Sequence, residues 1–436
     1  MVGPASIHIR NGKIERLGEY DEPASHAPSY DHGDQVIMAG LVDSHVHINE
    51  PGRTDWEGFE SGTRAAAAGG VTTLIDMPLN SIPATTSLSG LKAKIDSAAG
   101  KCFADVGFWG GVVPGNSLEL KKMFEAGAVG FKCFLVDSGV PEFACVDEND
   151  LREAMPLLAD MGAVLIVHAE VPGPIEHACT SAATSTLNPR KYETFLRSRP
   201  GLAEDDAVHL MVRLCSEFGT RVHIVHHSSA GSLGLIRDAK AEGLPLTAET
   251  CPHYLTFASE EIEDGSTEFK CCPPIRERSN REELWRALKD RTLDMVVSDH
   301  SPCPPSMKEP DSGDFMKAWG GISSLQLRLP IMWTRAWEHN IGLAQLSEWI
   351  CAAPARLVGL GAKKGRIAAG YDADVVIWDP EAEFEVSGSD LQHRHKVTPC
   401  MGKKVKGVVM QTYLRGRRTF DQGSFSEPQG ELLLHK

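Results

Sequence analysis

The sequence predicts an α/β fold in which eight parallel strands close into a TIM-type (β/α)8 barrel, with a small β-sandwich beside it. Three observations lead to this fold class. From residue 36 to residue 300, short apolar runs alternate with segments of helical period, which is typical of a parallel sheet with right-handed crossovers. Eight such repeats favour a closed barrel over an open, doubly wound sheet. No Gly-x-Gly-x-x-Gly pattern follows a predicted strand, so a dinucleotide-binding sheet is not indicated.

Residue type and period give the individual elements in chain order. Apolar and β-branched runs predict strands, and apolar residues recurring every three or four positions predict helices. The predicted strands are Val36–His47, Val71–Met77, Ala104–Val113, Ala128–Leu135, Ala163–His168, Arg221–His226, Pro245–Glu249 and Asp294–Ser298. The helices predicted between them include Trp56–Ala68, Ser117–Ala126, Glu148–Asp160, Glu204–Phe218, Leu233–Glu242 and Arg281–Lys289.

The two chain ends are β-rich. Ala5–Arg10 and Lys13–Leu17 flank Asn11-Gly12 and predict a hairpin with a two-residue turn. Three short runs near the other end also predict strands: Asp374–Trp378, Lys404–Met410 and Thr412–Leu414. Short strands at either end cannot bury a face alone, so we expect one small β-sandwich assembled from both ends.

The expected division of the chain follows from these patterns. Residues 1–40 form the N-terminal part of the sandwich, residues 41–362 the barrel, and residues 363–436 the C-terminal part of the sandwich and a tail. Within the barrel, Ser266–Lys270 and Pro302–Gly321 are rich in Pro, Gly and polar residues. They predict mobile loops at the carboxyl ends of the strands.

Composition excludes several classes of partner. The chain has 436 residues, of which 44 are basic and 59 acidic, and its formal charge is −15. Lys and Arg form no long cluster that could follow a phosphate backbone, so nucleic acid is not an expected partner. Since no apolar stretch is long enough to cross a bilayer and no basic-then-apolar leader is visible, we expect neither a membrane partner nor secretion.

The cysteines indicate a reducing compartment. All eleven are scattered without paired spacing, and Cys102, Cys133 and Cys215 lie in apolar runs where a small hydrophobic residue would serve. We therefore expect reduced thiols and an intracellular protein, with the cytoplasm favoured. The sequence ends in Leu434-His435-Lys436 rather than Ser-Lys-Leu, so no peroxisomal signal is visible. Because the chain enters its first strand abruptly, a missing leader stays open, and neither a peroxisomal nor a mitochondrial location is excluded.

The first predicted strand ends in two histidines with the spacing of metal ligands. It closes as Asp43-Ser44-His45-Val46-His47, after which Asn49-Glu50-Pro51-Gly52 interrupts the strand. Residues two apart on a strand point to the same face, so the imidazoles of His45 and His47 can reach one metal ion. A single His-x-His is more often a pair of solvated histidines, and only further candidates change that interpretation.

Four further candidates lie at the ends of other predicted strands. Lys132 lies near the end of the fourth strand, His168 ends the fifth, His226 ends the sixth and Asp299 follows the eighth. In an α/β barrel the carboxyl ends of the strands meet at the active site, so all these side chains are expected to converge. The recurrence favours a shared metal centre over isolated surface residues.

Lys132 is the unexpected member of this group. It lies inside the apolar run Val129–Leu135, where an ammonium would lose its hydration. A desolvated lysine has a lowered pKa, and its neutral amine can add carbon dioxide to form a carbamate. An isolated lysine at a strand end more often extends its head to solvent, but next to four histidines and an aspartate we expect a carbamate that bridges two cations.

These ligand types suit a pair of divalent ions. Four neutral imidazoles, a bridging carbamate and a carboxylate favour zinc, and iron, cobalt and manganese stay open. Two such ions roughly 3.5–4 Å apart can hold a hydroxide between them and polarise a carbonyl oxygen. Asp299 could take the hydroxide proton and pass it to a departing nitrogen. The sequence therefore predicts metal-assisted hydrolysis.

Several neighbouring residues have weaker claims. His223, His227 and His300 adjoin predicted ligands and are interpreted as supporting or core residues; alternation favours His226 over His227 as the sixth-strand ligand without excluding His227. His253 could line the pocket or pack beneath it. Cys272 has no assigned base, so a nucleophilic role is not expected.

The chain resembles the cyclic amidohydrolases of the amidohydrolase superfamily, and the resemblance spans almost its whole length. The motifs that carry it are Gly40–His47, Gly130–Phe134, Val225–Ser229, Val297–Pro302, Ala355–Leu357 and Gly365–Asp374. Within this group, Glu50–Phe59, Asp76–Asn80 and Trp319–Ile322 are similar to the allantoinases, whereas dihydroorotases and dihydropyrimidinases usually differ there.

The resemblance implies an activity and residue roles. Allantoin would be the substrate, and its hydantoin ring would be opened to allantoate, a step in purine and ureide breakdown. His45 and His47 would bind one ion, His168 and His226 the other, with Lys132 bridging and Asp299 as ligand and proton carrier. Substrate contacts are implied at Asn80, Cys272, Trp319 and Gly320. The resemblance also implies a homotetramer.

Three departures from the family pattern bear on these implications. Cys272 stands where many relatives have a Ser whose backbone contacts the ring amide, so substrate choice depends on whether backbone or hydroxyl makes that contact. His227 occupies a position that is often apolar. The N-terminus lacks the leading strand that is usual in relatives, which indicates truncation or a shortened sandwich.

Two other functions stay open. One is a dihydropyrimidinase or hydantoinase acting on a related cyclic ureide. The other is a catalytically silent scaffold, since some relatives of dihydropyrimidinase keep the fold without the metal ligands. Every expected ligand type is present here, which favours an enzyme.

Overall fold

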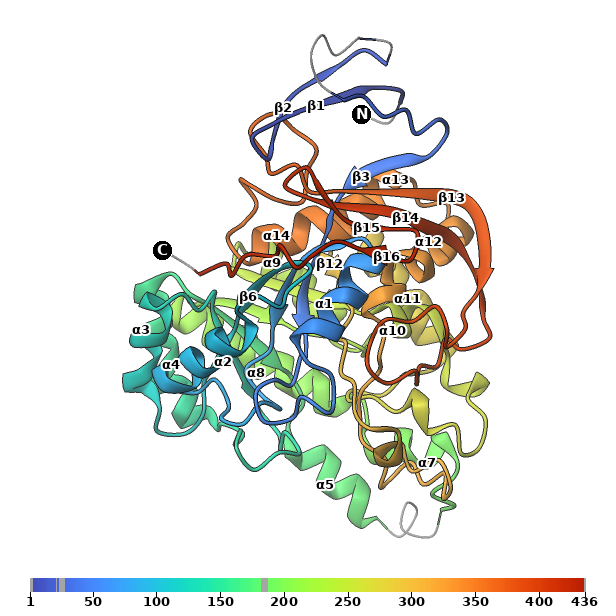
Figure 1. Cartoon of the computed structure of the whole chain (residues 1–436). Coiled ribbons are helices and arrows are strands. Elements are labelled where there is room, and N and C mark those ends of the chain that lie inside the picture. The colour runs from blue at the N-terminus through green and yellow to red at the C-terminus, as the bar shows by residue number, and fades with distance from the viewer. Residues whose placement is uncertain (1–2, 21, 23–27, 182–186, 435–436) are drawn as a thin grey trace.

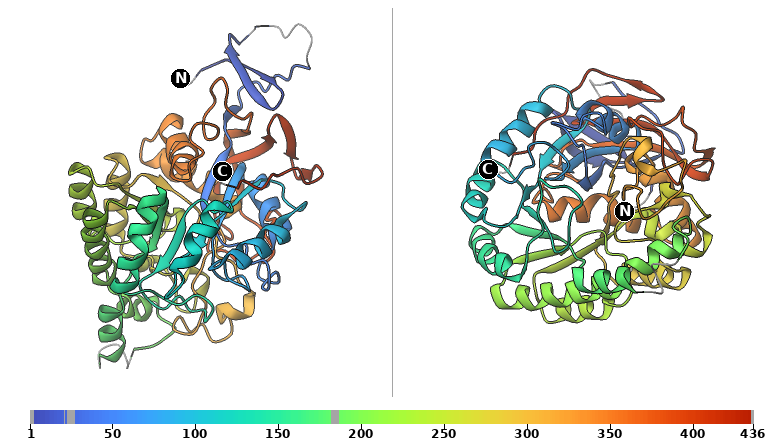
Figure 2. Two further views of the ribbon diagram at one scale, coloured as in Figure 1. Left: turned by 90° about the vertical axis from the view of Figure 1, so that its left-hand side faces the viewer. Right: turned by 90° about the horizontal axis from the view of Figure 1, so that it is seen from below.

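The computed structural model describes residues 3–20, 22, 28–181 and 187–434. Parts of the expected terminal segments, residues 1–2, 21, 23–27 and 435–436, lie outside the described residues. A barrel of parallel strands lies below a curved antiparallel sheet and an N-terminal hairpin in Figure 1. Seen along the other axis in Figure 2, helices form a ring around the barrel.

Parallel strands form the barrel in sequence order, which confirms the predicted fold class. The first three belong to one ladder, β4-β5-β6, and the others to a second ladder, β7 to β12. Their bounds are β4 Leu41–Val46, β5 Val71–Asp76, β6 Asp105–Phe108, β7 Gly110–Gly111, β8 Phe131–Phe134, β9 Val164–His168, β10 Arg221–Ile224, β11 Leu246–Thr250 and β12 Met295–Val296. A parallel bridge between Val46 and His300 joins the last strand region to the first and closes the barrel.

Several strand predictions need correction in their extent. The predicted strand Ala104–Val113 divides at Trp109 into β6 and β7. Gly110 and Gly111 approach Phe131 and Phe143 so closely that an added Cβ would lie 2.6 Å and 2.5 Å from the rings, so this part of the strand packs tightly against its neighbours.

The last predicted strand, Asp294–Ser298, is reduced to β12, Met295–Val296. The backbone N–H of Ser298 donates to the side-chain carboxylate of Asp43, at 3.2 Å, instead of to a backbone carbonyl of a neighbouring strand. The chain leaves the ladder at this point, just before Asp299.

Helices cover the outside of the barrel. The predicted helices are present, with some changed ends: Trp56–Ala68 begins only at Phe59, because Gly58 with φ 105° precedes the first turn, and Arg281–Lys289 begins three residues earlier. The bounds are α1 Phe59–Ala68, α2 Leu88–Ala98, α3 Ser117–Glu125, α4 Glu148–Met161, α5 Pro172–Thr180, α7 Tyr192–Ser198, α8 Leu202–Phe218, α9 Leu233–Ala241, α10 Pro252–Thr256, α11 Arg278–Lys289, α12 Arg328–Glu338, α13 Leu343–Ser347 and α14 Ala353–Leu357. A π-turn, Glu348–Ala352, joins the last two.

The antiparallel sheet combines both chain ends, as predicted. Its order is β16-β15-β14-β13-β3, and the N-terminal strand β3 pairs with β13 so that Val36 lies opposite Trp378. The bounds are β3 Val36–Ala39, β13 Val375–Glu385, β14 Lys404–Leu414, β15 Arg417–Asp421 and β16 Ser424–Phe425. The prediction of two strands, Lys404–Met410 and Thr412–Leu414, is wrong, because pairing with β13 and β15 holds Gln411 within one strand.

The predicted run Val36–His47 serves two sheets. Gly40 separates β3 in the antiparallel sheet from β4 in the barrel, and an added Cβ at Gly40 would overlap the side chain of Thr72. These pairings support the division into residues 1–40, 41–362 and 363–436, which we propose as the domain organisation.

The predicted hairpin is present but forms a separate two-stranded sheet. Its strands are β1 Ser6–Arg10 and β2 Lys13–Gly18. Backbone hydrogen bonds join it to the C-terminal segment: Ile14 donates to the carbonyl of Tyr371 at 2.9 Å, and Gly370 donates to the carbonyl of Ile14 at 2.8 Å. Both chain ends are thus fastened together beside the amino ends of the barrel strands.

The loops predicted at the carboxyl ends contain short 3-10 turns. These are η2 Thr267–Phe269 and η3 Pro305–Lys308; η1 Ser259–Glu261 and η4 Leu325–Leu327 lie nearby in sequence.

Among the described residues, none of the helices is both long enough and apolar enough to cross a membrane.

Candidate metal centre

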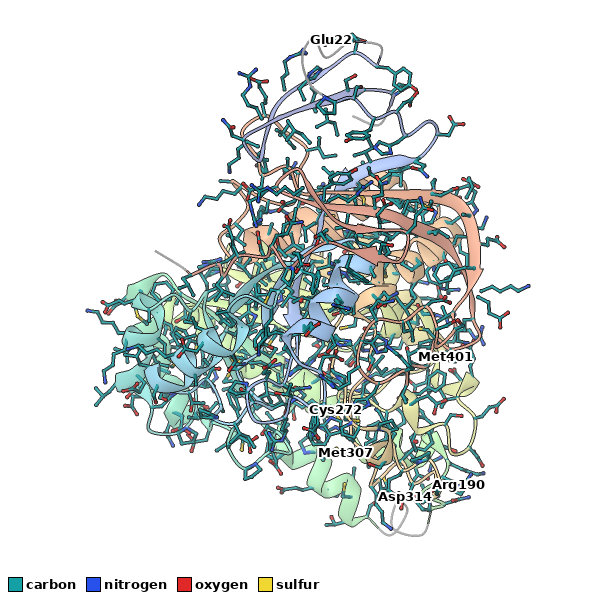
Figure 3. All side chains as sticks on the ribbon, in the orientation of Figure 1. Glu22, Arg190, Cys272, Met307, Asp314 and Met401 are labelled. Atoms are coloured by element: carbon teal, nitrogen blue, oxygen red, sulfur yellow. The ribbon has the colours of Figure 1, made fainter. Side chains whose placement is uncertain are left out.

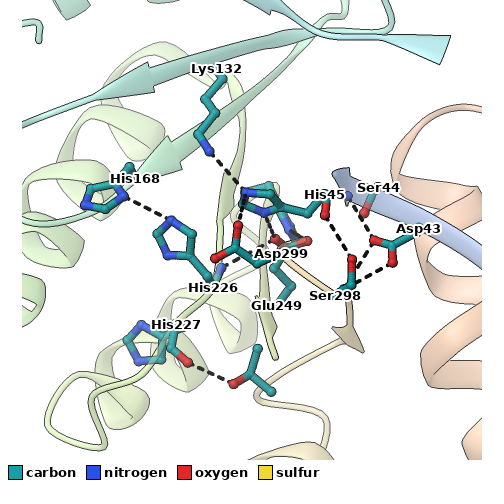
Figure 4. Close-up of polar contacts among 12 residues, drawn as sticks. Asp43, Ser44, His45, Lys132, His168, His226, His227, Glu249, Ser298 and Asp299 are labelled. Atoms are coloured by element: carbon teal, nitrogen blue, oxygen red, sulfur yellow. Dashed lines mark hydrogen bonds and ion pairs between the residues drawn. The ribbon is translucent and has the colours of Figure 1, made fainter. Parts of the chain in front are cut away.

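The six predicted ligands converge at the carboxyl ends of the barrel strands. His45 lies in β4, Lys132 in β8 and His168 at the end of β9. His47, His226 and Asp299 follow β4, β10 and β12 by one to three residues. Figure 4 shows five of these side chains, all except His47, pointing toward a common centre.

One group consists of His45, His47 and Asp299. Oδ1 of Asp299 lies 3.1 Å from Nε2 of His45 and 3.6 Å from Nε2 of His47. The three ligand atoms lie within 4.8 Å of one another, and all three residues are buried. Two imidazole nitrogens and a carboxylate oxygen at this spacing form a site that can hold one divalent metal ion.

His168 and His226 form a second group beside the first. Nδ1 of His168 lies 3.0 Å from Nε2 of His226. The ring centroids of His45 and His226 are 5.3 Å apart, so the two groups are neighbours. Two buried imidazole nitrogens this close have the arrangement of ligands that share a cation.

Lys132 lies between the two groups. Its Nζ is 3.1 Å from Nε2 of His45, and the side chain is buried. Burial lowers the pKa of Lys132 to about 8, since the charged ammonium loses its hydration. Near neutral pH the neutral amine is therefore far more populated than in an ordinary exposed lysine, although it is still the minor form.

Three of the histidines have the protonation state that a metal requires. Burial lowers the pKa of His47 to about 3 and lowers the pKa values of His168 and His226. These neutral imidazoles present lone pairs, and the pKa of Asp299 lies well below its usual value although burial opposes its ionisation. The donor set therefore fits divalent cations.

The backbone is unusual at two of these positions. His226 has φ 38° and Asp299 has φ 45°, in the left-handed region that non-glycine residues rarely adopt. Such conformations persist where the surrounding structure imposes them, and they concentrate at functional sites. They turn both side chains back over the barrel mouth after β10 and β12.

Glu249, at the end part of β11, orients His45. Its Oε1 lies 2.6 Å from Nδ1 of His45, and its Oε2 lies 3.0 Å from Nε2 of His223. The two histidines hold the pKa of Glu249 near 2 although burial opposes ionisation. With Nδ1 of His45 engaged in this way, its Nε2 is directed at the metal position.

Glu170 orients the ring of His168. Its Oε2 lies 2.8 Å from Nε2 of His168 and 2.6 Å from Nη2 of Arg199. Arg199 and His168 hold the pKa of Glu170 well below its usual range. His168 therefore presents Nδ1 toward His226.

Sequence reasoning missed both carboxylates and Arg199. Glu170 lies two residues after His168, which is the spacing for the same face of an extended segment. Glu249 ends the seventh predicted strand. Those signals could have identified the carboxylates, whereas nothing local in the sequence connects Arg199 with His168.

The structure places the other histidines around the centre. The ring of His227 lies apart from the other labelled side chains in Figure 4. Its Nδ1 is 3.8 Å from Glu204, and its Nε2 is 3.4 Å from the hydroxyl of Ser232. His300 accepts from the backbone N–H of Ser324 at 3.2 Å.

His253 is buried beside Asp299, and its ligand atom joins a second group with Cys251 and Asp299 within 4.8 Å. Burial lowers the pKa of His253 to about 4. It lies beneath the centre and does not line the cavity described next.

A cavity of about 400 Å³ opens above the cluster. Five of the six predicted ligands line it, and His45 lies behind them. The residues implied as substrate contacts, Asn80, Cys272, Trp319 and Gly320, all line it as well. In Figure 3, Cys272 lies with Met307 in the lower part of the barrel, far from the N-terminal hairpin.

Comparison with known proteins gives the family. Residues 36–419 match the sequence model described as the amidohydrolase family. The chain belongs to the amidohydrolase family. This confirms the resemblance inferred from the motifs.

Similar proteins of this family include several allantoinases. The allantoinase of Streptomyces avermitilis is 50% identical over 99% of this chain and 95% of its own length. Those of Saccharomyces cerevisiae and Arabidopsis thaliana are 46% and 42% identical, over 92% and 98% of this chain and 86% and 87% of their own lengths.

A similar solved structure is an L-hydantoinase (dihydropyrimidinase) from Arthrobacter aurescens. It has a TM-score of 0.93 and 31% sequence identity, and the match covers 99% of this chain and 96% of that chain. The likeness confirms the barrel with its accompanying β-sandwich.

Proposed function

We propose that this protein hydrolyses the cyclic amide bond of allantoin and releases allantoate. The observation that carries the proposal is the convergence of metal-ligand side chains at the base of one cavity of about 400 Å³, a volume that suits a small cyclic substrate. The allantoinases at 42–50% identity favour allantoin over other cyclic ureides.

The ligand assignment belongs to this proposal. In this assignment His45 and His47 would hold one ion, His168 and His226 would hold the other, and carboxylated Lys132 would bridge them, with zinc favoured. The short contact between Lys132 and His45, and that between His168 and His226, support this arrangement. When bound, two such ions supply a hydroxide nucleophile at neutral pH and polarise the scissile carbonyl.

Asp299 is the proposed proton carrier. Its buried carboxylate lies beside His45 and His47 and lines the cavity, within reach of a bound substrate. The hydroxyl of Ser301 lies 3.2 Å from its Oδ1 and can hold the carboxylate in place. We assign to Asp299 the transfer of a proton from the nucleophile to the departing ring nitrogen.

Backbone groups of Cys272 and Gly320 are proposed to hold the ring. Neither of their N–H groups donates to another described residue, and both residues line the cavity. A backbone contact does not depend on the side chain, so Cys in place of Ser at position 272 is compatible with a cyclic ureide. Asn80, in the segment after β5, and Trp319, next to Gly320, complete the proposed contacts.

A homotetramer and a cytoplasmic location complete the proposal. The eleven cysteines are all free, which supports a reducing compartment. A relative from Aquarana catesbeiana, 50% identical over 83% of this chain, bears the name "Allantoinase, mitochondrial", so fractionation is needed to identify the compartment. Light scattering of the purified protein tests the tetramer.

One assay tests the function. Purified protein is given allantoin, and metal content is measured on the same sample. We expect allantoate to form, with two divalent ions per chain. The hydantoinase neighbour in structure favours a second candidate, hydrolysis of a related ureide such as dihydrouracil. Faster turnover of dihydrouracil than of allantoin would establish that alternative, and a metal-free, inactive protein after purification with zinc would indicate a scaffold.

A further inference from the structure

Lys308 is a buried lysine at the end of the 3-10 turn η3, next to the cavity. Its Nζ donates to three backbone carbonyl groups: those of Lys270 at 3.2 Å, Trp319 at 2.9 Å and Gly321. Among the described residues, no carboxylate forms an ion pair with it. The ammonium is therefore satisfied by peptide oxygens alone.

A buried charge of this kind is costly. Removing an ammonium from water without a counterion is unfavourable unless every N–H finds an acceptor, and burial lowers the pKa of Lys308 accordingly. An apolar residue of similar length could fill the same space at lower cost. An apolar residue could not, however, donate hydrogen bonds to three carbonyl groups on two separate loops.

These two loops carry the backbone groups proposed to hold the substrate ring. One is the segment from Lys270 to Cys272, and the other runs from Trp319 to Gly321. They are also joined directly, since Gly321 donates to the carbonyl of Lys270 at 2.9 Å. Lys308 thus lies where the two loops meet, and it does not itself line the cavity.

The loops approach each other closely at Gly320. A Cβ added there would lie 3.0 Å from Sγ of Cys272 and 3.8 Å from its backbone N, so the two segments are in van der Waals contact. Such close contact requires something that fixes both backbones. The three hydrogen bonds of Lys308 provide that restraint.

Lys308 also polarises the peptide group that contains the N–H of Gly320. The carbonyl of Trp319 and the N–H of Gly320 belong to the same peptide group. An ammonium bound to the oxygen of that group polarises it and strengthens the N–H as a donor. The N–H of Gly320 has no acceptor among the described residues and lies at the cavity, where a substrate carbonyl can accept from it.

We propose that Lys308 is a positioning residue that builds the ring subsite, by tying the Lys270–Cys272 and Trp319–Gly321 loops together and directing their free N–H groups at the amide edge of a cyclic ureide. The inference rests on the proposed function for the identity of the substrate. It assigns to Lys308 an effect on substrate affinity and none on metal binding.

The test compares Lys308→Met and Lys308→Arg with the wild-type protein. KM and kcat are measured with allantoin, and the inhibition constant with hydantoin, which has the same ring without the ureido group. We expect Lys308→Met to raise both KM and the inhibition constant about tenfold or more, the scale of a lost hydrogen bond to a buried ligand, with unchanged metal content. Lys308→Arg keeps a charged donor and should recover part of that loss.

Lys364→Met is the matched control. Lys364 is also a buried lysine, but it binds Asp105 at the amino end of β6, at the opposite end of the barrel. The Lys364→Met variant should be less stable than wild type and keep its affinity for hydantoin. If Lys308→Met leaves both constants within about twofold of wild type, or lowers metal content, the proposal is wrong.

Two further outcomes are also decisive. If Lys308→Met does not fold, the inhibition constant of Lys308→Arg carries the test: a raised value supports the proposal and an unchanged value overturns it. If the wild-type protein does not open allantoin, the proposed substrate is wrong, and the same comparison is made with whichever cyclic ureide it does open. A loss of affinity in Lys308→Met then still supports the role of Lys308.

Discussion

Oε1 of Glu249 lies 2.6 Å from Nδ1 of His45, and this contact sets which nitrogen of His45 faces the metal centre. Carboxylates in this position fix the orientation of ligating histidines, and their loss typically reduces metal affinity or activity about 10- to 100-fold. We therefore expect Glu249→Gln to lower kcat/KM and to lose metal during dialysis more readily than wild type. Metal analysis before and after dialysis checks this. Retention of both ions with full activity would contradict it.

His226 and His227 allow a comparison between adjacent residues. His226 faces His168 at 3.0 Å, whereas His227 lies against Glu204 and Ser232. His226→Asn should lose about one metal ion per chain and most activity, since one of two ligands on an ion is removed. His227→Asn should keep the metal. Metal content of the two variants, measured side by side, distinguishes them; equal losses would show that the centre depends on the turn as a whole.

The role of Lys132 as a bridge can be tested by chemical rescue. Lys132→Ala removes the amine that would carry the carbamate, so we expect activity to fall at least about a hundredfold. A short carboxylic acid such as acetate or propionate can occupy the space and bridge the ions, and should restore part of the activity. Rates with increasing acid concentration are the measurement. Undiminished turnover in Lys132→Ala without acid would rule out the bridging role.

Arg199 supports His168 through Glu170. It contacts both oxygens of Glu170, at 3.1 Å and 2.6 Å. Arg199→Met should leave the buried carboxylate without its cation and loosen His168, lowering metal affinity by about tenfold. Arg199→Lys keeps the charge but cannot form both hydrogen bonds to Glu170. Its metal affinity should lie between those of Arg199→Met and wild type. A competition assay with a chelator measures the affinity; identical affinities for all three proteins would contradict this support.

The C-terminal segment is joined to the barrel by a buried ion cluster. Nζ of Lys364 lies 2.8 Å from Asp105 in β6 and 2.6 Å from Asp374, just before β13. Removing one partner of a buried pair typically costs about 3–5 kcal/mol because the remaining charges stay buried. We expect Lys364→Met to lower the free energy of unfolding by an amount of this order, measured by denaturant titration at pH 7. A change below about 1 kcal/mol would show that the cluster contributes little.

The sequence by itself determined the order of strands and helices and the fold class. Strand periodicity and helix periodicity are local properties, and eight repeats of both leave few topologies. The prediction of strand bounds was less reliable where close packing decides the backbone, as at Gly110 and Gly111. It also failed where Gln411, beside a shift in register, pairs within one long strand.

Local sequence also placed six candidate ligands at strand ends, because the carboxyl ends of parallel strands share one face of a barrel. It could not show which atoms face one another. Only the tertiary structure turned His226 inward and His227 outward, and brought Glu249 and Arg199 to the histidines that they support. It also gathered two distant loops around the ammonium of Lys308. Such contacts join residues far apart in the chain, and their geometry depends on how the whole barrel closes rather than on any neighbouring residues.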